Sequence, residues 1–203
     1  MILKSDKLAE RLVQGADPAT VDPLVITPSV DLAELAQAGA GSIDLRLGTW
    51  FMTLRQARMS CLEIDKPGGQ AKLTKTHFVP FGGEYYLHPR SFVLAATLEW
   101  MRLPRDLAAY VTGKSSWGRR GLIIATATGV HPGFKGCLTL ELSNVGELPI
   151  AIKPGMQICQ LFFHKVSTDN NAVDQSLFNG RRRPVLGKAE LDLIAKKLAE
   201  ANA

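Results

Sequence analysis

Short apolar stretches dominate the chain between positions 43 and 163. They are rich in β-branched, aromatic and aliphatic residues, and Gly, Pro, Asn or Asp separates most of them from the next. Many short strands separated by turn signals, with no long helices between them, favour an all-β sandwich or barrel. The predicted strands are Ile43–Leu47, Trp50–Leu54, Glu84–Leu87, Phe92–Leu98, Leu107–Thr112, Leu122–Thr128, Cys137–Ser143, Leu148–Ile152 and Gln157–Phe163.

The two ends of the chain carry a different pattern. Ser5 and Asp6 are placed to cap a short helix, and Leu8 and Leu12 share one of its faces. Residues 16–28 predict a loop and residues 31–37 a helical turn. An amphipathic helix is predicted over residues 188–201. We therefore expect one domain over residues 1–203, with a helical and loop region (1–40), a β core (41–166) and a tail with a helix (167–203).

Composition narrows the class of protein without selecting a partner. Of 203 residues, 46% are hydrophobic and 21% are charged, which is ordinary for a soluble globular protein. The net charge of +5 suits an anionic ligand such as a nucleotide, but it describes many other proteins too. Three widely spaced cysteines predict neither a disulfide framework nor a thiolate zinc site. Without a signal sequence or an apolar run of about 18 residues, we expect a cytoplasmic protein with no membrane or nucleic-acid partner.

A loop between two predicted strands concentrates small residues, hydroxyl groups and cations. It reads Gly113-Lys-Ser-Ser-Trp-Gly-Arg-Arg-Gly121. Such a loop can present backbone N–H groups, serine hydroxyls and an arginine fork to a phosphate. A basic surface turn has the same composition, and the order of residues is not that of a Walker loop.

Polar residues at three other places in the predicted β core are candidates for chemistry. In the strand around Leu140, a period of two places Thr139 and Glu141 on the face opposite the leucines. Glu141 there is either solvated or, with a substrate on that face, a general acid and base. His131, in a glycine-rich turn, is either exposed or a ligand contact. Asp44 and Arg46 alternate with apolar residues, as in a half-buried strand whose polar pair forms a salt bridge or faces a cleft.

Five stretches together resemble the dCTP deaminase/dUTPase family, in the family's order and nearly at its spacing from Gly41 to Phe162. Their sequences are GSIDLRLG from Gly41, YLHPRSFVLA from Tyr86, GKSSWGRRGL from Gly113, PGFKGCLTLE from Pro132 and LPIAIKPGMQICQLF from Leu148. The resemblance implies a distorted β-barrel or jelly roll that assembles as a homotrimer with sites shared between adjacent subunits.

The resemblance also implies roles for particular residues. It implies that Glu141 shuttles protons while water attacks C4 of cytosine, and that Ser115 helps orient the water or the base. No zinc is expected, and Mg²⁺ would arrive with the triphosphate. The positions that the resemblance assigns to nucleotide binding are Lys114, Ser115, Ser116, Arg119, His131, Thr139 and Arg181.

Three functions remain open from the sequence. Deamination of dCTP to dUTP and ammonia, which supplies dTTP synthesis, is favoured by Glu141. A dUTP diphosphatase is the second, although His131 stands where that activity uses an Asp. A non-catalytic nucleotide-binding regulator is the third, because the segment Gly121–Pro132 is one residue short and the tail carries Leu177 and Arg181 where Lys and Gln are usual.

Overall fold

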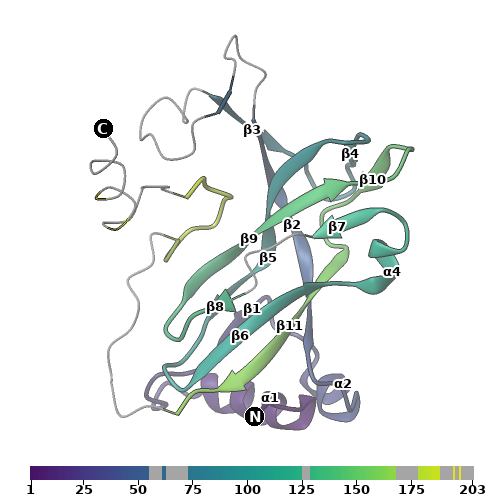
Figure 1. The fold of residues 1–203 in the computed structure, drawn as a ribbon. Helices are drawn as coiled ribbons and strands as arrows, with labels where there is room; N and C mark the ends of the chain where they lie inside the picture. Colours follow the sequence, from purple (N-terminus) through teal and green to yellow (C-terminus); the bar gives the residue numbers. More distant parts are fainter. Residues whose placement is uncertain are drawn as a thin grey trace.

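The structure is a computed structural model that describes residues 1–54, 61–62, 73–124, 129–167, 178–187, 194 and 197. It is mainly β and confirms the predicted fold class (Figure 1). The helices are α1 (Ser5–Gly15), α2 (Leu32–Gln37) and α4 (Ser115–Gly118). The strands are β1 (Val25–Thr27), β2 (Ile43–Leu54), β3 (Thr74–Phe78), β4 (Tyr85–Leu87), β5 (Phe92–Arg102), β6 (Leu107–Gly113), β7 (Leu122–Ile124), β8 (Gly129–Val130), β9 (Lys135–Asn144), β10 (Ile150–Ile152) and β11 (Gln157–Lys165).

One antiparallel sheet carries most of the fold. Its strand order is β7-β9-β5-β2-β11-β6-β8, with β1 added beside β5 and β3 beside β2, and β10 pairs separately with β4. The long strand β2 holds the curled sheet together, because Ile43–Arg46 pair with β11 whereas its later residues pair with β3 and β5. The sheet therefore wraps around its own apolar core.

The core follows from the alternation of side chains along the strands. On β9, Leu138, Leu140 and Leu142 are buried, and the residues between them are only half-buried. Phe51 on β2 and Phe163 on β11 are fully buried against the same core. Burying a side chain of this size stabilises a fold by about 1.5–3 kcal/mol. The period of two predicted for this part of the chain is thus confirmed.

The two N-terminal helices lie together at one end of the sheet, at the bottom of Figure 1. Leu8 and Leu12 of α1 are buried, as their spacing predicted. The predicted capping of α1 is wrong, because Lys4 is the N-cap and Ser5 is already helical and buried. The Ser5 amide instead donates to the Ala40 carbonyl over 2.8 Å, which ties the start of α1 to the β core.

Several predicted boundaries differ from the structure. Ile43–Leu54 form one strand, since Gly48 packs tightly against the β5 backbone and does not interrupt β2. Val25–Thr27 lie in a predicted loop but form the short strand β1. The neighbouring prolines favoured a loop in the sequence, whereas pairing with β5 makes the segment a strand. The last residues of the predicted strand at 122–128, the tail residues 168–177 and most of the predicted helix at 188–201 lie outside the described residues. No described helix is long and apolar enough to cross a membrane.

Candidate functional site

Glu141 lies on the side of the sheet that faces away from the apolar core. We call this side of β2, β5 and β9 the outer face. Cross-strand pairing joins Met52 to Leu94 and Leu94 to Glu141, so these three side chains form one row across the outer face. Ala96 and Thr139 pair in the next row. The structure therefore places the two predicted site residues of β9 side by side on one surface.

The Glu141 carboxylate combines partial burial with freedom from internal partners. Its residue is half-buried, and the neighbouring Leu94 is only 8% exposed. Within the described ranges, no ion pair or side-chain hydrogen bond engages this carboxylate. A carboxylate with no competing protein cation is available to take a proton from a bound water and to return it.

The predicted phosphate loop is a single helical turn fastened to β11. The backbone N–H of Lys114 donates to the Ile158 carbonyl over 3.3 Å, and the Trp117 indole N–H donates to the Gln157 carbonyl over 2.8 Å. Ser115, Ser116 and Arg119 are exposed on this turn. Two hydroxyls and one guanidinium are thereby held on a fixed backbone where an anion can reach them.

Lys114 points in a different direction from the exposed residues of its loop. Its ammonium group lies 2.5 Å from the carboxylate of Asp44 and also donates to Oε1 of Gln157 over 3.2 Å. The other Asp44 oxygen accepts from the Gln160 amide over 3.2 Å. In this structure Lys114 is therefore engaged in an internal ion pair that anchors the loop to β2 and β11.

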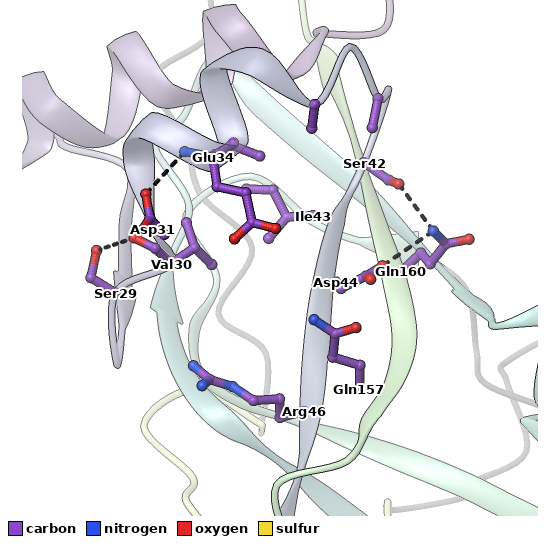
Figure 2. A pocket seen from close by; sticks show the side chains of 13 residues that line it. Ser29, Val30, Asp31, Glu34, Ser42, Ile43, Asp44, Arg46, Gln157 and Gln160 are labelled. Atoms are coloured by element: carbon purple, nitrogen blue, oxygen red, sulfur yellow. Dashed lines mark hydrogen bonds between the residues drawn. The ribbon is translucent and has the colours of Figure 1, made fainter.

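A cavity of about 430 Å³ opens beside that ion pair (Figure 2). Figure 2 shows Asp44, Arg46 and Gln157 from β2 and β11 on one side and Glu34 from α2 on the other. Both polar residues of the Ile43–Leu47 stretch line the cavity, which confirms the cleft predicted for them. They do not form a salt bridge with each other, because Asp44 pairs with Lys114 and Arg46 with Glu99.

Glu99 of β5 is a charged residue that the sequence analysis did not single out. Its side chain is fully buried, and its two oxygens accept from the Arg46 backbone N–H over 2.8 Å and from Nε of Arg46 over 2.7 Å. Glu99 directly follows the predicted strand Phe92–Leu98, whereas Glu141 lies inside a predicted strand; in the structure both are inside strands. Sequence alone does not show which of the two is buried and paired.

The remaining predicted residues lie near β9. His131 is exposed in the turn between β8 and β9. Arg181 pairs through its backbone with Gly136, the second residue of β9. At the other end of β9, β7 pairs Leu122 with Asn144 and connects the strand to the loop that carries Ser115. Among the described residues, no group of three His, Cys, Asp or Glu side chains is arranged to hold a metal ion.

The fold and this arrangement define a class of protein, a β-sheet domain with a basic serine-containing loop beside a strand that carries a glutamate. A family model described as dCTP deaminase-like matches residues 4–166. The chain belongs to the dCTP deaminase-like family.

Relatives similar over most of the chain agree with this assignment. The chain is 40% identical over 172 residues to a dCTP deaminase of Halorubrum lacusprofundi, covering 83% of this chain and 79% of the relative. It is 33% identical over 204 residues to a dUMP-forming dCTP deaminase of Methanobrevibacter smithii, covering 97% of this chain and all of the relative.

The crystal structure of a dCTP deaminase from Agrobacterium tumefaciens superimposes with a TM-score of 0.58 at 21% identity, over 80% of this chain. The match spans 46% of the Agrobacterium chain. At this identity the superposition supports the shared fold.

Proposed function

We propose that this protein is a dCTP deaminase that converts dCTP and water to dUTP and ammonia. The observation that carries the proposal is the half-buried Glu141 carboxylate, which has no partner among the described residues and lies on a strand that β7 connects to the Ser115 loop. Its relatives over most of the chain carry the name dCTP deaminase. The nucleotide would arrive as its Mg²⁺ complex, in which the metal is part of the substrate.

In this mechanism Glu141 takes a proton from the water that attacks C4 of cytosine and delivers it to N3. The hydroxyl now on C4 gives its proton, by way of Glu141, to the amino nitrogen N4, the C4–N4 bond breaks, and ammonia leaves as C4 becomes the carbonyl of uracil. Ser115 orients the water or the base, and Ser116 and Arg119 bind the triphosphate. A positioned general acid and base contributes about 10²- to 10⁴-fold to a rate. We assign contact with the base to Thr139, which lies in the row next to Glu141.

The test measures ammonia and dUTP after incubation with dCTP and Mg²⁺. We expect Glu141→Gln to lower kcat by about 10²- to 10⁴-fold, because the amide cannot accept the proton. Glu147→Gln is the matched control, since Glu147 is exposed in the turn after β9. Wild-type activity in a folded Glu141→Gln protein would contradict the mechanism.

We further propose that the active protein is a homotrimer whose sites use residues from adjacent subunits. We take the exposed Ser115 turn and the half-buried Glu141 on the outer face as the two parts of such a site, supplied by adjacent subunits. Mixed assemblies of Glu141→Gln and Ser115→Ala chains test this proposal. Activity that returns on mixing supports shared sites, whereas two inactive proteins that stay inactive together contradict them.

A second activity, hydrolysis of dUTP to dUMP and pyrophosphate, is favoured by the relatives named dUMP-forming. In this activity His131, which is exposed, would act as the base in place of an aspartate. Chromatography that resolves dUTP from dUMP separates the two outcomes. Pyrophosphate release that survives Glu141→Gln and is lost in His131→Ala would support this activity.

A further inference from the structure

Residues 178–187 return to the sheet and pack beside the catalytic strand; we call them the docked segment. The Gly180 amide donates to the Lys135 carbonyl over 2.7 Å, and the Cys137 amide donates to the Arg181 carbonyl over 2.8 Å. The Asn179 side chain accepts from the Lys135 amide over 3.0 Å. The docked segment is thus bound through its backbone to the first residues of β9, the strand that carries Glu141.

Gly136 shows how close this approach is. Its φ is +139°, and a Cβ added there would lie 2.9 Å from the Arg181 carbonyl oxygen. Only glycine fits both the backbone conformation and the available space. In the docked segment itself Pro184 is buried, as expected of a segment packed on a surface.

Beyond β9, the docked segment reaches β2 through a single side chain. The guanidinium carbon of Arg183 lies 3.8 Å from the centre of the Trp50 ring. Trp50 is two residues before Met52, so both side chains project from the same side of β2, the outer face. The contact therefore fastens the docked segment to the surface on which Glu141 lies.

The rows of the outer face show what lies between the two attachments. Ala96 of β5 pairs with Thr139 of β9, and its neighbour Ala95 pairs with Phe51, the residue after Trp50. Although Ala96 belongs to the outer face, it is only 2% exposed. Ala96 is thus a covered position of the outer face, in the row next to the one that contains Glu141.

We infer that Trp50 is a positioning residue that, through Arg183, holds the docked segment over the outer face of its own subunit and so retains the nucleotide beside Glu141. This inference rests on the proposed deamination for its kinetic consequence, but the attachment itself is independent of substrate. At an exposed site such as that of Arg183, a cation over an aromatic face stabilises by an amount equivalent to about a 2- to 5-fold change in an equilibrium.

The experiment compares Trp50→Leu, Arg183→Ala and the double variant with the wild type. We expect each single variant to raise KM for dCTP by about 2- to 5-fold, with kcat within about twofold, and the double variant to add nothing further. Trp50→Phe and Arg183→Lys should raise KM less than Trp50→Leu and Arg183→Ala do, since a ring and a cation remain. If Trp50 acted only by stabilising the sheet, Arg183→Ala, which leaves the sheet unchanged, would not reproduce the rise in KM seen in Trp50→Leu.

Hydrogen exchange without nucleotide gives the second measurement. The amides of Gly180 and Cys137 donate in the docked arrangement, so they should exchange faster in both single variants. Arg182→Ala is the matched control, because it removes the same charge one residue away and leaves the Trp50–Arg183 contact in place. Its Gly180 and Cys137 amides should keep wild-type protection.

The outcomes separate the attachment from the reaction. Faster exchange in both variants of a protein that shows no turnover would support the attachment and overturn the proposed deamination. Normal wild-type turnover with unchanged exchange and unchanged KM in both variants would overturn the attachment. A lower KM in Trp50→Leu and Arg183→Ala would also overturn the inference, because the docked segment would then obstruct the site.

Discussion

Glu99 and Glu141 lie on adjacent strands of one sheet, yet they differ in burial and in ion pairing. Glu99 is fully buried, and Arg46 donates to both of its oxygens. Glu141 is half-buried on the outer face, and among the described residues its carboxylate has no protein partner. A charge that must leave water needs a partner, whereas a charge that must transfer protons is better left without one. Pairing therefore separates a structural glutamate from a candidate catalytic one.

The largest effect on stability is expected for Glu99→Ala. This change leaves the Arg46 guanidinium beside an apolar gap and removes the acceptor of the Arg46 amide. Breaking a buried pair costs about 3–5 kcal/mol, and we expect about 3 kcal/mol because Arg46 is still 34% exposed. Urea unfolding measures the loss. Glu10→Ala, which breaks an exposed pair with Lys7, is the control and should change little. Equal losses in the two variants would contradict the comparison.

The next effect in size concerns the docked segment. Gly136→Ala should cost about 2 kcal/mol, because an unfavourable backbone conformation and a close carbonyl act together. It should also speed amide exchange at Gly180, the neighbouring attachment. Gly129→Ala is the control, since nothing lies within 4 Å of a Cβ built there. If both variants are equally stable, the close approach of the docked segment to β9 is wrong.

High pH should lower the free energy of unfolding through the buried thiol of Cys159. Burial, followed by the nearby charges of Glu99 and Asp44, raises the pKa of this thiol to about 12 from 9.0. The unfolded chain therefore loses the proton first, so stability is complete below pH 9 and falls as pH rises toward 12. The slope is on the order of 1 kcal/mol per pH unit.

Unfolding midpoints at several pH values check this expectation. Cys159→Ala should flatten the fall in stability above pH 9, whereas Cys61→Ala should not, because Cys61 is exposed. A wild-type slope that persists in Cys159→Ala would show that the buried thiol is not its source.

The smallest effect on stability is expected at the proposed catalytic residue. Glu141→Gln should change the free energy of unfolding by no more than about 0.5 kcal/mol, because no internal partner among the described residues is lost. The same variant should lose most of its deaminase activity. A stability loss as large as that of Glu99→Ala would mean that Glu141, too, has a structural role.

The sequence predicted the β class because side chains alternate between the two faces of a strand. That period places Leu138, Leu140 and Leu142 in the core and Thr139 and Glu141 on the opposite face, as the structure has them. Asp31, which accepts from the amides of Ala33 and Glu34, likewise caps α2 where a helical turn was predicted. These features depend on local geometry, which neighbouring residues in the sequence determine.

Tertiary structure decided which charges are paired. Arg46 and Glu99 are 53 positions apart in the chain, and Lys114 and Asp44 are 70 apart, so no local pattern relates them. The contact of Arg183 with Trp50 arises in the same way, from two segments that meet only on the folded sheet. The sequence by itself determined the faces of the strands and the residues able to do chemistry. Only the fold decided which of those residues are neutralised and which stay available, because ion pairing depends on proximity in space.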